Sequence, residues 1–200
     1  MITIRKATLD DYKDFCELIL VSAPYFPILF GNKTKTVLQN LFRYHSNLFS
    51  FEHVYFAEVD GKKAGMILGY DWQNKKRENL RTGFLLFKEI GFGILVKFLS
   101  LIKFKETVGK VRDGEYYISN IAIYPQYRGQ GVGKGLMFQA EQEAKMIGVE
   151  RIVLDVEKEN IIAINFYKKL GYKMTKEFSI SIRGSKILYF HRMAKENLKF

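Results

Sequence analysis

Cysteine is almost absent from this 200-residue chain, in which Cys16 is the single example. One cysteine excludes an internal disulfide framework and any cysteine-rich metal cluster, and it suits a reducing compartment. The 3 histidines show no spacing that is typical of a metal site. Residues 1–6 contain no apolar segment of the kind found in secretory signals, so we expect a cytoplasmic protein.

Acidic residues are also scarce relative to basic ones, 21 against 32, which gives a net charge of +11. An excess of positive charge suits a polyanionic ligand. The sequence has no basic run interleaved with aromatic side chains and no zinc-finger signature, so nucleic acid is not expected as a partner. Hydrophobic residues make up 48% of the chain, enough for the core of a single domain over residues 1–200.

The most informative segment covers residues 127–136, where glycine occupies every second position from 129 to 135. A strand-like apolar run at 117–123 precedes this loop, and apolar residues at helical spacing follow it from 132 to 147. Backbone N–H groups of a glycine loop at a helix N-terminus can approach an anion closely. The sequence therefore predicts a site for a phosphate or pyrophosphate.

Two common phosphate-binding motifs do not fit this loop. A Walker loop requires Ser or Thr after its Gly-Lys, but Gly135 follows Lys134. A dinucleotide fingerprint that starts at Gly129 or Gly131 requires a third glycine where Lys134 or Leu136 stands. Both kinds of site are therefore disfavoured.

The pattern Arg128-x-x-Gly131-x-Gly133 resembles the acyl-CoA loop of the GNAT superfamily of N-acetyltransferases. A second segment resembles another motif of that family and follows at the usual distance: Asn160-x-x-Ala163-x-x-Phe166-Tyr167-x-x-x-Gly171-Tyr172. The resemblance implies an α/β fold with a mixed, mostly antiparallel central sheet of about six to seven strands. Such a sheet contains a parallel, splayed pair of strands and is flanked by helices.

The resemblance also implies how the co-substrate acetyl-CoA would bind. Its pantetheine arm would bond to the backbone of the strand before the loop, and its phosphates would lie on the loop. The implied residues are Ile121, Ala122, Ile123, Arg128, Gly129, Gln130, Gly131, Val132, Gly133, Lys134 and Asn160.

Three catalytic residues are implied as well. Tyr167 matches the tyrosine acid of the family, which protonates the departing thiolate. Glu115 stands where some histone-type members place a catalytic glutamate. Asn120 is expected to orient a water molecule or the substrate, and backbone N–H groups nearby to stabilise the developing oxyanion. No metal is implied.

We therefore expect an acetyl-CoA-dependent N-acetyltransferase in which a primary amine, on a small molecule or a peptide, attacks the thioester directly. The alternative is a CoA-binding sensor or interaction module without turnover, although such a module does not need Tyr167. No motif identifies the acceptor. The resemblance implies that an expected loop over 22–32 borders the acceptor site, which makes Tyr25, Phe26 and Phe30 candidates to contact the acceptor, with core packing the expected role of at least two of them.

Periodicity predicts the other elements. We expect a strand at 2–7, helices at 9–20, 34–45 and 161–170, a strand at 151–156 parallel to the one before the loop, and hairpins at 53–70 and 172–193. Asp60-Gly61 would turn the first hairpin and Arg183-Gly184 the second. The charged residues 74–81 are interpreted as a surface connection.

Residues 82–105 are almost entirely apolar and are interpreted as two short inserted helices. They would add to the core, form a lid over the acceptor site or provide a homodimer surface. Charges and a glycine break interrupt the segment and argue against a membrane span, so attachment to a membrane surface is a less favoured alternative.

Overall fold

The structure, a computed structural model, describes residues 1–91, 109–182 and 186–196. Its framework is a seven-stranded sheet with the order β1-β2-β3-β4-β5-β7-β6. Only β4 and β5 pair in parallel among these neighbours, which confirms the expected mixed, mostly antiparallel sheet. The strands are β1 (Ile2–Lys6), β2 (Val54–Val59), β3 (Lys62–Asp71), β4 (Glu115–Ile123), β5 (Arg151–Glu157), β6 (Lys173–Ile182) and β7 (Lys186–Lys195).

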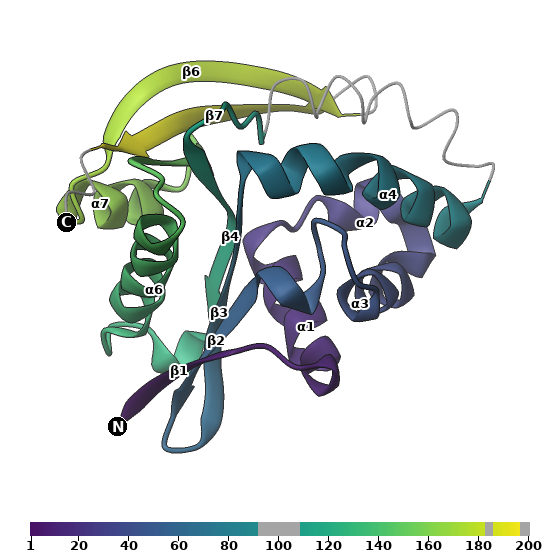
Figure 1. Ribbon diagram of the computed structural model, residues 1–200, viewed down its shortest axis with the longest axis horizontal. Helices are drawn as coiled ribbons and strands as arrows, with labels where there is room; N and C mark the ends of the chain where they lie inside the picture. Colours follow the sequence, from purple (N-terminus) through teal and green to yellow (C-terminus); the bar gives the residue numbers. More distant parts are fainter. Residues whose placement is uncertain (92–108, 183–185, 197–200) are drawn as a thin grey trace.

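Helices cover both faces of the sheet (Figure 1). One face carries α1 (Tyr12–Ser22), α2 (Phe26–Phe30), α3 (Thr34–Arg43) and α4 (Trp72–Ile90). The other face carries α6 (Val132–Met146) and α7 (Ile161–Lys169). The long hairpin of β6 and β7 arches over one end of both layers (Figure 1).

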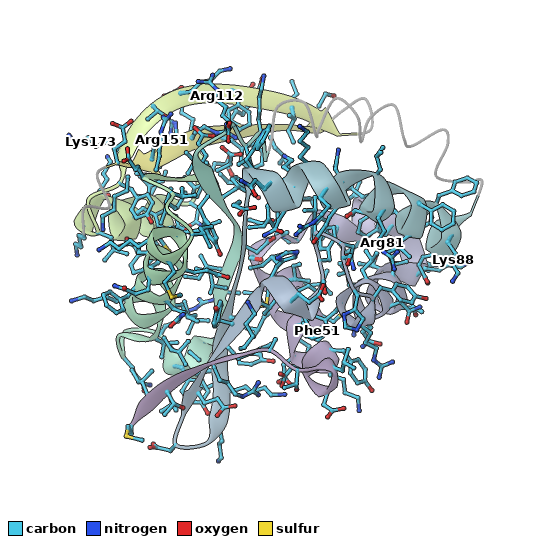
Figure 2. All side chains as sticks on the ribbon, viewed as in Figure 1. Phe51, Arg81, Lys88, Arg112, Arg151 and Lys173 are labelled. Atoms are coloured by element: carbon cyan, nitrogen blue, oxygen red, sulfur yellow. The ribbon has the colours of Figure 1, made fainter. Side chains whose placement is uncertain are left out.

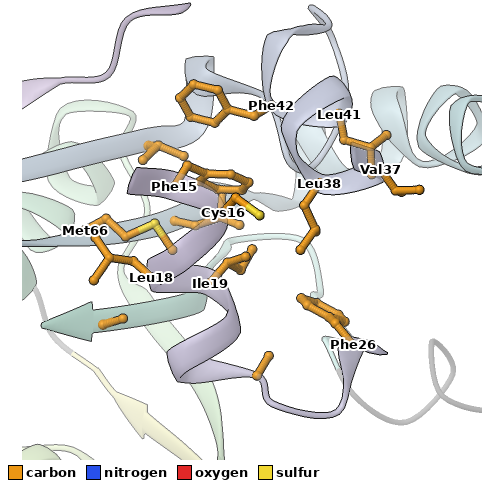
Figure 3. Close-up of a cluster of buried hydrophobic side chains, with 14 of the residues drawn as sticks. Phe15, Cys16, Leu18, Ile19, Phe26, Val37, Leu38, Leu41, Phe42 and Met66 are labelled. Carbon is orange, nitrogen blue, oxygen red and sulfur yellow. The ribbon is translucent and has the colours of Figure 1, made fainter. Parts of the chain in front are cut away.

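The core between α1, α3 and the sheet follows from the helical spacing of apolar residues. Phe15, Leu18 and Ile19 of α1 have no exposed surface, and neither do Leu38 and Phe42 of α3 (Figure 3). The rings of Phe15 and Phe42 lie 4.5 Å apart. Each such side chain stabilises the fold by about 1.5–3 kcal/mol through burial. This packing fixes α1 against the sheet and thereby places the end of α1 beside β4.

Both expected hairpins are confirmed in their strands. Asp60 and Gly61 join β2 to β3 with positive φ angles of 49° and 75°, as a two-residue turn between twisted strands requires. The expected turn at Arg183-Gly184 lies outside the described residues.

The prediction of a loop over residues 22–32 was wrong in part, because this stretch contains the short helix α2 and a helical turn at Gly31–Lys33. Pro27 stands in the first turn of α2, where a missing N–H costs no hydrogen bond. Phe26 and Phe30 are buried and stack at 5.4 Å, so two of the three aromatics are core residues, as expected.

The prediction of a surface connection at 74–81 was also wrong, because these residues lie within α4. The Asp71 carboxylate caps the helix by accepting a 2.6 Å hydrogen bond from the Asn74 N–H. The buried side of α4 includes Glu78, whose carboxylate lies 2.7 Å from Nε2 of His53. A helix with a polar buried side escapes detection by apolar periodicity.

Residues 82–90, the start of the expected apolar insertion, continue α4 instead of beginning a new helix. Arg81 and Lys88 project from the same helix (Figure 2). Residues 92–105 of the insertion lie outside the described residues. In the described ranges, no single helix is long and apolar enough to cross a membrane. One pair of helical segments, Leu9–Ser22 and Phe26–Arg43, has the required length and composition when taken together, but it is bent by 106°.

Candidate active site

The strands β4 and β5 separate partway along their length. Their parallel register runs from Glu115 opposite Arg151 to Ile118 opposite Leu154. Beyond that last pair, β4 continues to Ile123 and β5 to Glu157, with no pairing between these described segments. Backbone N–H and C=O groups along such a gap need other partners, and an extended ligand with amide groups can supply them as an added strand does.

A bulge at Ser119 determines which face of the sheet the following side chains meet. Ile118 and Asn120 pair with consecutive residues of β3, so Ser119 between them has no partner on that strand. Ile118 packs toward α6, and Ile121 does so three positions later, which shows that the alternation has shifted by one residue. Asn120 instead points to α1, where its Nδ2 donates to Oγ of Ser22 at 2.9 Å.

A cavity of about 590 Å³ occupies the gap, within the usual size range of ligand sites. Because the sheet is open there, the cavity wall includes residues from both faces. The side of α6 and α7 contributes Val132, Gly133, Ala163, Phe166 and Tyr167, and the side of α1 contributes Val21, Ser22, Tyr25, Asn120, Asp155, Glu157 and Phe190.

The glycine loop closes one end of this cavity. Gly131 caps α6 with φ 85°, a left-handed conformation that favours glycine. The first hydrogen bond of the helix runs from Gly135 N to Gly131 O, at 3.0 Å. The N–H groups of residues 132–134 come before Gly135 in the chain and therefore have no acceptor within the helix. The exposed cations Arg128 and Lys134 belong to the same end of the wall. This end is suited to bind phosphate groups.

Gly133 has a second role, in packing. A Cβ at this position would lie 3.2 Å from the Phe166 ring and 3.3 Å from Cδ1 of Ile123. The missing side chain therefore lets α6 approach α7 and the end of β4 closely, which shapes the cavity at the start of the helix.

Tyr167 lies on α7 with 7% of its surface exposed. Asn160 fixes the start of this helix, because its Oδ1 accepts a 3.1 Å hydrogen bond from the Ala163 N–H. Burial raises the pKa of Tyr167 above its ordinary value of about 10, so the phenol keeps its proton at neutral pH. No described residue forms a hydrogen bond with its hydroxyl, although Tyr167 is part of the cavity wall. The arrangement therefore places a neutral phenol in the cavity wall.

The structure brings all the expected site residues to the cavity except Glu115 and Gln130. Glu115, at the start of β4, accepts hydrogen bonds from the Arg112 N–H at 2.8 Å and from the Arg151 guanidinium at 3.0 Å. Arg112 and Arg151 lie toward the end of the molecule where the β6–β7 hairpin arches (Figure 2). The Gln130 amide donates to the Gln126 carbonyl at 2.9 Å, on the outside of the loop.

Two carboxylates in the wall were missed from the sequence, Asp155 and Glu157 on β5. The Asp155 side chain is 1% exposed, and its two oxygens accept hydrogen bonds from the Arg192 guanidinium, both at 2.8 Å. The Gly109 N–H and the Tyr117 hydroxyl also donate to Asp155, at 2.8 and 3.2 Å. The available signal was a pair of carboxylates at alternate positions of a strand that is apolar from Ile152 to Leu154.

The chain is similar in sequence to known proteins. A model of the acetyltransferase (GNAT) family matches residues 17–172. The chain is 31% identical to an N-alpha-acetyltransferase of Sulfurisphaera tokodaii over 134 residues, 65% of this chain and 62% of that protein. It is 29% identical to an uncharacterized N-acetyltransferase of Methanocaldococcus jannaschii over 176 residues, 86% of this chain and 60% of that protein. The chain thus spans less than two thirds of each relative.

Solved structures share the fold. A crystal structure of an N-acetyltransferase from Staphylococcus aureus Mu50 superposes with a TM-score of 0.73 at 20% identity, covering 96% of this chain and 100% of that one. A putative acetyltransferase from Salmonella typhimurium, solved with acetyl-CoA, gives a TM-score of 0.61 at 15% identity and covers 98% and 93% of the two chains. The family match, supported by this shared fold, establishes that the chain belongs to the acetyltransferase (GNAT) family.

Proposed function

We propose that the protein is an N-acetyltransferase that uses acetyl-CoA to acetylate a primary amine. The observation that supports this proposal is the cavity through the sheet, whose wall includes both the N-terminus of α6 and Tyr167 of α7. The relatives named as N-acetyltransferases support the same activity.

The fit of acetyl-CoA to the cavity rests on two features. The N–H groups of residues 132–134, with Arg128 and Lys134, suit its phosphates. The unpaired edge of β4 at residues 119–123 suits an arm that contains amide groups. When bound, acetyl-CoA supplies an activated acetyl thioester. An anionic head followed by an amide-bearing arm therefore matches the order of groups along the wall.

In this proposal, Tyr167 donates the proton that the departing sulfur requires. Its hydroxyl is neutral and has no hydrogen-bond partner among the described residues, so donation breaks no internal hydrogen bond. Asn120 has a positioning role, because its amide is already held by Ser22 and accepts a 2.9 Å hydrogen bond from Ser119. Backbone N–H groups near the bulge would stabilise the developing oxyanion. Glu115 is not included, since Arg151 holds its carboxylate away from the cavity.

Thiol release from acetyl-CoA in the presence of a panel of amines tests the proposal. An amine-dependent release, with the acetylated amine identified by mass spectrometry, is the expected result. A folded protein that binds CoA in a calorimeter but releases no thiol with any amine would favour the CoA-binding module instead. A protein that does not bind CoA would overturn both functions.

A further inference from the structure

The gap between β4 and β5 is closed at one end, where the last paired residues are Ile118 and Leu154. We call this point the fork. Both side chains belong to the cavity wall, and each is 2% exposed. Both also belong to the buried cluster that includes Leu136 of α6 and Tyr167 of α7. The fork therefore has an apolar floor, formed by one side chain from each strand.

Neighbouring strands hold this floor in place. β4 also pairs with β3, where Ile118 lies opposite Gly69, and β5 also pairs with β7, where Leu154 lies opposite Met193. Met193 has no exposed surface. A close-packed interior of this kind accepts additional volume only when side chains leave their preferred rotamers or the backbone shifts. The floor should therefore resist any group that is too large for the space above it.

The other side of the fork, toward α1, is polar. Ser119, Asn120 and Asp155 belong to the cavity wall on this side. Ser119 donates to Asn120 at 2.9 Å, and the Asp155 carboxylate accepts two hydrogen bonds from Arg192. A hydrocarbon chain against these groups would exclude water from them without offering a hydrogen bond. An alkyl group at the fork is therefore better accommodated over the floor than on this side.

In the binding mode proposed above, the acyl group of the donor lies at the fork. The glycine loop follows the end of β4 at Ile123, so it lies at the other end of the unpaired segment 119–123 from the fork. An arm that starts from phosphates on the loop and pairs with this segment runs toward the fork. The thioester at the end of the arm then meets the floor.

We propose that Ile118 and Leu154 limit the acyl donor to short, apolar acyl groups such as acetyl. The inference rests on the proposed N-acetyltransferase function and adds the class of acyl donor to it. An acetyl group ends at the floor, whereas a longer chain has to displace a packed side chain or turn toward the polar side of the fork. The limit is therefore one of size, determined by two side chains that face each other across the strand pair.

The first test compares acetyl-, butyryl- and hexanoyl-CoA with one amine that the protein acetylates. We expect kcat/KM to be at least about tenfold lower for butyryl-CoA than for acetyl-CoA, and lower again for hexanoyl-CoA, as for other pockets that discriminate by a methylene group. Calorimetric Kd values of the three thioesters should rise in the same order and give a readout without turnover. An open site would give the reverse order of Kd, because a longer chain buries more apolar surface.

The second test enlarges the space above the floor. Leu154→Ala should shift the ratio of kcat/KM values at least about tenfold in favour of butyryl-CoA over acetyl-CoA. The matched control is Leu136→Ala, which removes the same atoms from the same buried cluster but outside the cavity wall, and should leave the ratio unchanged. If Leu154→Ala does not fold, Ile118→Val removes a single methyl group from the floor and should shift the ratio severalfold. Its control is Ile152→Val, also in the cluster and outside the wall.

The outcomes separate the inference from the proposed function. Equal kcat/KM and Kd values for all three thioesters, or a preference for acetyl-CoA that the floor variants do not change, would overturn the inference and leave the function intact. Kd values that rise with chain length and depend on the floor, without thiol release in the presence of any amine, would support the inference and contradict the function. A folded protein that binds none of the thioesters would overturn both.

Discussion

Asp155 and Arg192 face each other across β5 and β7 and are joined by two parallel hydrogen bonds of 2.8 Å. The carboxylate is 1% exposed and the guanidinium side chain is 13% exposed. The guanidinium also donates to the Lys110 carbonyl at 2.8 Å, so this arginine connects three segments of the chain.

Replacing Arg192 should therefore destabilise the protein strongly. Arg192→Met leaves a buried carboxylate without its counter-charge, and the free energy of unfolding should fall by about 3–5 kcal/mol. Urea denaturation measures the loss. The matched control is Lys158→Met, which breaks an ion pair whose side chains are 54% and 57% exposed and should cost about 1 kcal/mol or less. Equal losses for the two variants would contradict this account.

Removing only the hydroxyl of Tyr167 should separate catalysis from packing. Tyr167→Phe keeps the ring beside Phe166 and Tyr172, and the hydroxyl has no described partner that would be left unsatisfied. Stability and CoA affinity should be unchanged, whereas turnover should fall on the order of 10²-fold if the phenol is the general acid. Near wild-type turnover at saturating acetyl-CoA would reduce Tyr167 to a packing role.

The pH dependence of turnover offers an independent check of the same residue. The raised pKa of Tyr167 keeps the phenol protonated beyond its ordinary pKa of about 10, so loss of this proton should not lower the rate in the alkaline range up to that pH. The pH profile of kcat at saturating acetyl-CoA measures this. A fall of kcat centred near pH 8 to 9 in the wild type, and absent from Tyr167→Phe, would contradict this expectation, because it would show that the phenol loses its proton below its ordinary pKa.

Glu115 should matter for stability and not for turnover. Glu115→Gln keeps an acceptor for the Arg112 N–H but removes the charge beside Arg151, which should cost about 1–3 kcal/mol. Turnover per folded molecule should match the wild type, because the carboxylate lies outside the cavity. A folded Glu115→Gln protein with a large loss of kcat would return this residue to the list of candidate bases.

The conformation of Gly131 gives a prediction about the loop. At φ 85°, Gly131→Ala places a Cβ in a left-handed conformation, which should cost about 1–2 kcal/mol of stability. Gly131→Asn should cost less, because asparagine tolerates this conformation better. Thermal and urea denaturation of both variants measure the difference. If alanine proved as stable as asparagine here, backbone strain would not be the reason for glycine.

The sequence was sufficient to predict the elements from β4 to α7, because each of them has a local signal. The glycine run marks the start of α6, helical apolar spacing marks its length, and Asn160 marks the start of α7. Local signals of this kind report on residues that are close in the chain. The strand, loop and helix that form the glycine-loop end of the cavity were therefore predictable from residues 115–170 alone.

The burial of Asp155 and the helix α4 were not predictable, because their features arise from residues far apart in the chain. Glu78 is buried on α4 because it meets His53, 25 positions earlier. Asp155 is buried because it meets Arg192, 37 positions later. Glu115 has the position in the sequence of a candidate catalytic glutamate, but its carboxylate is held by Arg151 on the neighbouring strand. A pattern within one segment does not contain these pairings.

The two ends of the cavity also differ in how the chain builds them. Residues 118–134 form most of the loop end as one continuous stretch, whereas the opposite end draws on the end of α1, the end of β5 and β7. Single substitutions can therefore change the opposite end in any of three separate segments without altering the helix N-terminus. During divergence, a chain built in this way can change the ligand groups that fit the opposite end while it retains the glycine-loop end.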